Sequence, residues 1–294
     1  MRSVLVLIQP YHLDELHFAW SYRVYCRWQT YRGRPHPPLA GLDAAALGDL
    51  LRPYHIHVLE ATGRANEFRM LTSLRPEETV AACMGKAKGR VSKWLREALG
   101  LQDAAKLLSR GYFACTTGKP SAEAVEHYLG HQGEHHGYAA RINPPIFVER
   151  YPMTVADEAD LRPQHAVTRL RLHIVLATWR RKGVFTQPEG RAVTARWRQM
   201  QRKFPMILEK VSFVPDHVHL AIHIHPQVSP AKLVVAMMNA AQELCWADFD
   251  QRVIRAGVAR LWQPSAYIGA YGDLESKKIT AYIRQWKNDN QEEG

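Results

Sequence analysis

The sequence contains few cysteines, and they lie far apart. Only four occur in 294 residues, at positions 26, 83, 115 and 245, and no two of them form a CxxC pair. This scarcity argues against a disulfide framework and against a zinc knuckle. We expect the four thiols to be buried.

Long hydrophobic runs are also lacking. The apolar stretch at residues 1–8 is too short for a signal-peptide core or a membrane span, and we expect it to form a first strand. No membrane association and a cytoplasmic location are therefore expected. Extended disorder is not predicted either, since 46% of the chain is hydrophobic and 10% is aromatic.

Acidic residues are in the minority. The chain has 28 Asp and Glu against 39 Lys and Arg, which gives a formal net charge of +11. Such a balance favours a polyanionic partner, because neutralising phosphates releases counterions and steers encounter. A solvated basic surface would have the same composition, so charge alone leaves both interpretations open.

The two halves of the chain repeat one plan. Residues 22–29 and 172–179 both predict a strand that is followed by a basic turn, and a later strand in each half ends at a matching proline, Pro76 or Pro226. Because such landmarks keep their register over most of both halves, we interpret the chain as a tandem repeat.

Each half has short strands, rich in β-branched or aromatic residues, interspersed with helices. Residues 79–99 and 229–248 have a helical apolar period and follow a start signal. The strands outnumber those that parallel βαβ units need, which favours an α+β fold. We expect two tandem ferredoxin-like domains, each an antiparallel sheet with helices packed on it, forming an internal pseudo-dimer. Their expected ranges are 1–141 and 164–294, joined by a linker at 142–163.

His217 and His219 are separated by one apolar residue. On a strand, residues i and i+2 point to the same face, so both imidazoles can converge on one ion. A divalent metal held there could polarise a phosphate oxygen. The same pattern occurs at residues 55–57 and 223–225, so it is not specific by itself. We expect His223 and His225 to face solvent.

Three motifs in the second half carry a resemblance to a known family. They are DHVHL at residues 216–220, WRRK at 179–182 and ITAYI at 279–283. Together they resemble the HUH transposases that use a single tyrosine and mobilise insertion sequences and REP elements. The resemblance covers nearly all of residues 165–294.

This resemblance implies an enzyme that nicks single-stranded DNA and transfers the strand through a 5′-phosphotyrosine intermediate. Attack by a tyrosine phenolate on phosphorus suits that role, because it conserves the bond energy for rejoining. The implied cofactor is Mg²⁺ or Mn²⁺, and the implied partner is single-stranded DNA that forms hairpins. The alternatives are a domesticated nickase or relaxase-like initiator, and a catalytically inactive DNA-hairpin binding protein.

The resemblance also bears on which tyrosine is the nucleophile. In the resembled family, the tyrosine helix presents a glutamine four residues later as a further metal ligand, and these two positions share one helix face. Tyr128 has Gln132 at this spacing, whereas Tyr282 is followed there by Trp286. We therefore favour Tyr128 as the nucleophile and keep Tyr282 as the alternative.

The histidine pair has the opposite distribution. Glu67 and Arg69 stand in the first half where the second half has His217 and His219. An arginine cannot hold a metal ion. The two halves have thus lost opposite parts, which predicts one composite site that combines the histidine pair with the first-half tyrosine and glutamine. We expect a monomeric pseudo-dimer rather than an obligate homodimer.

Basic residues in two segments are candidates for contacts with DNA phosphates. One group follows the first strand of the second half, and the other lies on the expected helix at 79–99, for which a solvated helix face is the alternative. These candidates are Arg180, Arg181, Lys182, Lys86, Lys88, Arg90 and Lys93.

Overall fold

The structure, a computed structural model, describes residues 10–101, 106–118 and 147–272, together with Lys278, Thr280, Ala281 and Ile283. The strand expected at residues 1–8 lies outside these residues. No helix in the described ranges is long and apolar enough to cross a membrane. All four cysteines are free and buried, as expected.

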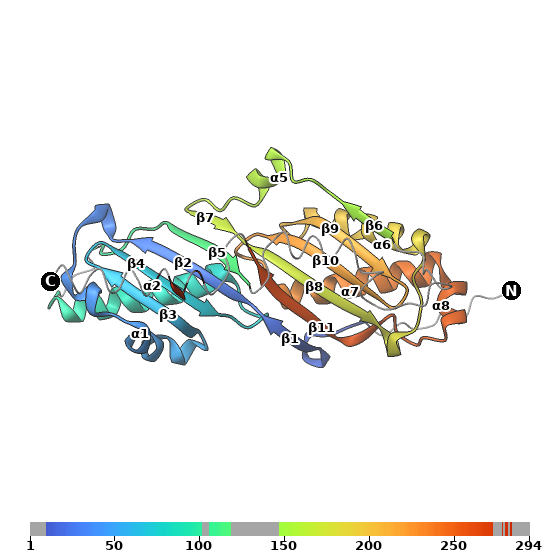
Figure 1. Cartoon of the computed structure of the whole chain (residues 1–294), viewed down its shortest axis with the longest axis horizontal. Coiled ribbons are helices and arrows are strands. Elements are labelled where there is room, and N and C mark those ends of the chain that lie inside the picture. Colours follow the sequence, from blue (N-terminus) through green and yellow to red (C-terminus); the bar gives the residue numbers. More distant parts are fainter. Residues whose placement is uncertain are drawn as a thin grey trace.

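Two antiparallel-rich sheets lie end to end along the molecule (Figure 1). The first is five-stranded, in the order β3-β4-β2-β5-β7, and the second is six-stranded, in the order β1-β11-β8-β10-β9-β6. The strands of the five-stranded sheet are β2 (Arg23–Gln29), β3 (His57–Arg64), β4 (Glu67–Ser73), β5 (Tyr112–Thr117) and β7 (Ala166–Arg169). Those of the six-stranded sheet are β1 (His17–Ser21), β6 (Phe147–Arg150), β8 (Arg171–Thr178), β9 (Met206–Val214), β10 (His217–Ile224) and β11 (Trp262–Tyr271).

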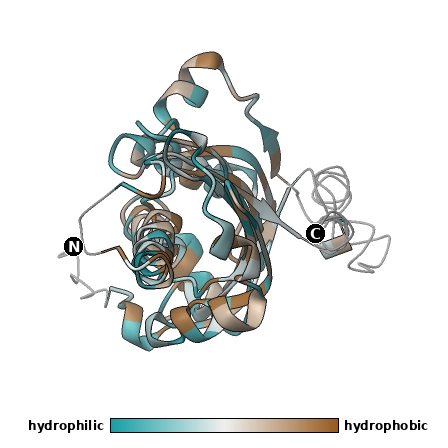
Figure 2. Cartoon of the chain, turned by 90° about the vertical axis from the view of Figure 1, so that its left-hand side faces the viewer, coloured by the Kyte–Doolittle hydropathy of each residue, from teal (hydrophilic) through white to brown (hydrophobic). Residues whose placement is uncertain are grey.

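Long helices cover one face of the sheets (Figure 2). The predicted helices at 79–99 and 229–248 are confirmed as α2 (Val80–Ala98) and α7 (Pro230–Asp248). Each begins where the sequence signals a start, because Thr79 and Ser229 accept hydrogen bonds from backbone amides of the first turn. The other α-helices of the described residues are α1 (Ala44–Leu51), α5 (Val155–Asp160), α6 (Gln187–Gln199) and α8 (Asp250–Ala256).

The core lies between the sheets and these helices. Alternate strand residues point into it, such as Ile174 on β8 and Leu220 on β10, both fully buried. The intervening residues of the same strands point to the opposite face, which is the face that carries the candidate site. On each of these strands, one set of alternate residues therefore packs in the core, and the other set lies on the face of the candidate site.

The two halves exchange strands. β1 pairs in parallel with β11 of the second half, although it leads directly into β2 of the first half. β7 pairs in parallel with β5 of the first half and leads directly into β8 of the second (Figure 1). Periodicity predicts strands but does not say that these two would cross between the halves.

Reciprocal contacts join the halves at the landmarks of the repeat. The amide of Ala81 donates to the carbonyl of Pro226 at 2.8 Å, and the amide of Ala231 donates to the carbonyl of Pro76 at 2.9 Å. Each of the two matching prolines therefore accepts a hydrogen bond from the first turn of the long helix in the other half. Such paired contacts are those that a two-fold relation produces.

The expected linker at 142–163 contains part of the sheet. Within it, β6 pairs antiparallel with β9 and places Phe147 against Phe213, with ring centroids 6.3 Å apart. The prolines in this range gave no reason to expect a strand. Phe147 is buried because β6 lies next to β9. The domain ranges 1–141 and 164–294 stay a prediction, since β1 and β7 lie in the sheet of the other half.

Candidate active site

His217 and His219 lie on β10, on the face of the six-stranded sheet opposite the core. Their exposed fractions are only 1% and 4%, and their ring centroids are 5.0 Å apart. Val218 between them is fully buried on the core side. The strand thus brings the two imidazoles together on one face, the arrangement expected from their spacing.

Asp216 holds the first of these histidines. Its Oδ1 lies 2.7 Å from Nδ1 of His217, and its Oδ2 lies 2.8 Å from Nε of Arg181. Burial opposes ionisation of Asp216, but the hydrogen bond with His217 and the charge of Arg181 outweigh it and lower the pKa of this carboxyl group. A carboxylate accepts, so Nδ1 of His217 carries the proton and Nε2 is the nitrogen suited to a metal.

His173 on β8 contacts the second histidine of the pair, His219. Its Nε2 lies 2.9 Å from Nδ1 of His219, and the two rings stack with centroids 5.2 Å apart. Burial lowers the pKa of His173 to about 4, so its imidazole is neutral near pH 7. This contact again leaves Nε2 of His219 as the nitrogen suited to a metal. Sequence reasoning missed His173, although its position among the outward-facing residues of an otherwise apolar strand was a usable signal.

A third histidine of β10, His223, is only 5% exposed, so its expected exposure to solvent was wrong. Its Nε2 donates to Oε2 of Glu209 at 2.8 Å, and the hydroxyl of Tyr271 donates to the same oxygen at 3.0 Å. Burial opposes ionisation of Glu209, but these hydrogen bonds and the charge of Arg171 lower its pKa to about 2. A partly buried carboxylate on a neighbouring strand could not be read from the sequence.

On the five-stranded sheet, Glu67 and Arg69 occupy the positions that the histidine pair occupies on the other. Nε of Arg69 lies 2.5 Å from Oε1 of Glu67, and the two side chains are 9% and 14% exposed. This face therefore holds an internal ion pair at the positions where the second half has two imidazoles.

One described residue near the C-terminus, Ile283, lies on that same five-stranded sheet. Ile283 is 1% exposed and packs with Tyr25, Leu71 and Cys115. These three residues come from β2, β4 and β5 of the first half. The last described residue of the second half thus packs on the sheet of the first. Tyr128, Gln132 and Tyr282 lie outside the described residues.

The donor atoms of the histidine pair fit a divalent metal, but two imidazoles are not a complete site. Among the described residues, no group of three or more His, Cys, Asp or Glu could hold a metal ion. Further ligands would have to come from elsewhere, and the expected amide ligand, Gln132, lies outside the described ranges. In both rings of the pair, Nδ1 has a hydrogen-bond partner. Such a partner fixes the orientation of a metal-binding histidine and leaves Nε2 for the metal.

Two residues of the basic turn after β8, Arg181 and Lys182, make contacts within the protein. Arg180 and Arg181 adopt positive φ angles of 52° and 56°, and the turn brings Arg181 to Asp216. Nζ of Lys182 donates to the carbonyl of Gly257 at 3.0 Å. Arg180 is exposed, with its guanidinium 5.9 Å from the Trp179 ring centroid. DNA contacts by these three residues stay a prediction.

The candidate residues on α2 also contact the protein itself. Nζ of Lys88 donates to three backbone carbonyls, those of Ser109, Arg110 and Gly111, and burial lowers the pKa of Lys88 to about 8. A phosphate contact by Lys88 would have to compete with these bonds. The other three pair as follows: Lys86 with Glu78 at 3.3 Å, Lys93 with Glu97 at 3.9 Å, and Arg90 over the Tyr54 ring at 5.6 Å.

Comparison with solved structures gives a match to the crystal structure of a candidate transposase from Deinococcus radiodurans R1. The two are 22% identical, and the match covers 44% of this chain and 95% of that chain with a TM-score of 0.35. A likeness at this level carries no argument about function. Comparison with curated proteins gives no match.

The family comparison is more informative, because it recovers both halves of the repeat. The model described as "Transposase IS200 like" matches residues 44–132 and again residues 166–286. These two segments make up more than half of the chain, and the second contains the histidine pair. The chain therefore belongs to the family of IS200-like transposases.

Proposed function

We propose that this protein cuts and rejoins single-stranded DNA at one composite active site. The observation that carries the proposal is the pair of imidazoles on β10, whose Nδ1 atoms are held by Asp216 and His173 at 2.7 and 2.9 Å. These two oriented nitrogens could supply two ligands of a divalent metal, for which we propose Mg²⁺ or Mn²⁺ with oxygen ligands completing the site.

The bound metal would polarise a phosphate oxygen of the DNA. Tyr128 would then form a bond from its phenolate oxygen to phosphorus, while the bond from phosphorus to the 3′ oxygen breaks. The phenol proton is lost to solvent, and the departing 3′ oxygen takes up a proton. Attack by another 3′ hydroxyl on the phosphotyrosine reverses the exchange and joins the strands.

Packing of Ile283 supports Tyr128 over Tyr282. Ile283 packs on the five-stranded sheet, so a nucleophile next to it would serve that sheet, where Glu67 and Arg69 form an ion pair. In a reciprocal arrangement, the corresponding first-half segment would cover the six-stranded sheet and its histidine pair. We infer that each half is a ferredoxin-like domain and that the two form an internal pseudo-dimer.

Two facts of the fold support this arrangement. Each half contains the order strand, helix, strand, strand, helix, strand, and its own four strands have the same spatial order in both sheets. Exchanged strands and reciprocal proline contacts join the halves. The halves are therefore tied together within one chain, as the subunits of a two-fold dimer would be.

The test is covalent capture of DNA. Labelled single-stranded DNA containing the hairpins of the flanking locus is incubated with Mn²⁺ or Mg²⁺ and the wild type, Tyr128→Phe, Tyr282→Phe or His217→Ala. We expect an adduct on a denaturing gel from the wild type and from Tyr282→Phe only. Loss in Tyr282→Phe alone contradicts the composite site. No adduct from any of the proteins, with DNA binding intact, favours the catalytically inactive hairpin-binding protein.

A further inference from the structure

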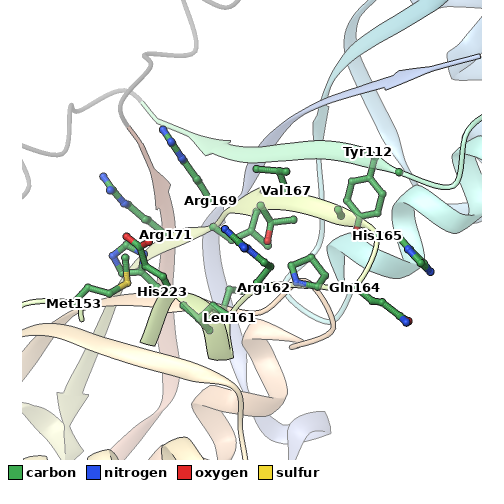
Figure 3. A pocket seen from close by; sticks show the side chains of 17 residues that line it. Tyr112, Met153, Leu161, Arg162, Gln164, His165, Val167, Arg169, Arg171 and His223 are labelled. Carbon is green, nitrogen blue, oxygen red and sulfur yellow. The ribbon is translucent and has the colours of Figure 1, made fainter. Parts of the chain in front are cut away.

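A pocket of about 820 Å³ lies where the two sheets meet (Figure 3). One side is formed by β7 and Tyr112 of the five-stranded sheet. Another is formed by the start of β8 and the end of β10, which contribute Arg171 and His223. The segment before β7 supplies a further wall. The lining of the pocket therefore combines the exchanged strand β7 with residues of both halves and of the segment that joins them.

This wall lies outside the segments that the family model matches. Its residues in the pocket run from Met153 through Glu158 to His165. They fall between the two segments that the family model matches, 44–132 and 166–286. The wall thus makes the pocket a place where this protein can differ from its relatives.

The charged side chains around the pocket are predominantly basic. Arg162, Arg169 and Arg171 line it together with His165, and Glu158 supplies the one carboxylate among the lining residues. In the view of Figure 3, Arg162 lies between Arg171 on one side and Tyr112 on the other. Planar guanidinium groups suit phosphate, because they offer paired donors to its oxygens.

One side of the pocket, formed by Arg171 and His223, lies on the same sheet face as the candidate active site, whereas Tyr112 packs toward the core of the first half. Along β10, His219 and His223 have the same parity, and along β8 the same holds for His173 and Arg171. Four residues of strand span about 13 Å from His219 to His223. That length corresponds to about four stacked nucleotides at ~3.4 Å each.

We propose that this pocket binds a nucleotide of the single-stranded DNA a few positions from the nicked phosphate. The arginines bind its phosphate, and the half-buried Tyr112 ring with the apolar wall receives the base. Such a site would hold the strand in register with the histidine pair, since one end of β10 serves the pocket and the other serves the chemistry. The proposal rests on the proposed function, because it assumes that single-stranded DNA lies along this face.

Arg162→Ala tests the phosphate contact, and Arg255→Ala is the matched control. Both arginines are exposed and both changes remove one charge, but Arg255 lies on α8, outside the pocket. Affinity for a labelled single-stranded oligonucleotide is measured by fluorescence anisotropy over a range of salt concentrations. We expect Arg162→Ala to weaken binding about 3–10-fold and to reduce the slope of log K against log salt by about 0.7, the value for one lost contact with a single strand. Equal effects of the two substitutions overturn the proposal.

Photo-crosslinking tests the base site. A 5-iododeoxyuridine is placed at one position at a time along the oligonucleotide, and the crosslinked peptide is identified by mass spectrometry. We expect a crosslink to Tyr112 or Met153 from a base about four nucleotides from the nick, with its yield reduced in Arg162→Glu. Crosslinks confined to other surfaces overturn the base site.

The two proposals fail in different ways. If the wild type forms the covalent DNA adduct but Arg162→Ala and Arg255→Ala bind alike, only the pocket assignment fails. If no adduct forms and Arg162→Ala still weakens binding selectively, the proposed chemistry fails, whereas the pocket remains a DNA-binding site.

Discussion

Replacing Asp216 with Asn tests whether His217 is a metal ligand. The carboxylate of Asp216 contacts Nδ1 of His217 at 2.7 Å and Nε of Arg181 at 2.8 Å. An amide of the same shape has one oxygen and one nitrogen, so it can accept from only one of these two donors. If its nitrogen faces His217, the imidazole must give up the proton on Nδ1 and place it on Nε2, where it blocks a metal.

The expected loss follows from what such partners contribute elsewhere. Removing the hydrogen-bond partner of a metal-binding histidine typically lowers metal affinity 10–100-fold. Each tenfold step corresponds to about 1.4 kcal/mol, so Asp216→Asn should cost about 1.4–2.8 kcal/mol of metal binding. The carboxylate is largely shielded, with 17% of its side chain exposed, which favours the upper part of that range.

Glu209→Gln is the matched control. Glu209 also forms a hydrogen bond with a histidine of β10, at 2.8 Å to His223, but we assign no metal to that histidine. Mn²⁺ affinity is measured by titration calorimetry, and the rate of DNA adduct formation is followed against Mn²⁺ concentration. Asp216→Asn should need 10–100-fold more Mn²⁺, and Glu209→Gln should stay within about twofold of the wild type. Equal Mn²⁺ requirements in both variants would refute the assignment of His217.

Two further predictions concern stability. Ile283→Ala should lower the free energy of unfolding by about 2–4 kcal/mol in urea, because Ile283 is 1% exposed and its loss leaves a cavity on the five-stranded sheet; an unchanged unfolding midpoint would contradict this docking. Glu209 should make stability fall in acid. Its pKa is lowered to about 2 in the folded state, so its contribution is complete above its ordinary pKa of 4.5 and is lost as pH falls toward 2. Allowing for its partial exposure, that contribution is about 2 kcal/mol, and Glu209→Gln should remove this part of the pH dependence of urea midpoints.

Local features of the fold could be predicted from the sequence because their causes are local. Helix starts at Thr79 and Ser229 follow from side chains that cap amides three residues away. The shared face of His217 and His219 follows from strand alternation alone. Each of these features needs only residues that are close in the sequence.

Neighbours across the sheets could not be predicted in this way. Alternation gives the face of His173, but its contact with His219 depends on β8 lying beside β10. The contact of Arg181 with Asp216 depends on a turn with two positive φ angles in non-glycine residues, which no propensity favours. The exchange of β1 and β7 depends on pairing between distant segments. A sequence pattern can predict such a strand but not the strand with which it pairs.

The proposed composite site gives a physical reason for the asymmetry of the two halves. In a dimer of identical chains, any substitution appears in both sites, so losing the histidines would inactivate both. A tandem chain lets each half change alone. On the five-stranded sheet, Arg69 and Glu67 then pair with each other, which satisfies two charges that would be costly to bury singly. In the proposed arrangement, the surviving histidine pair works with the tyrosine of the other half.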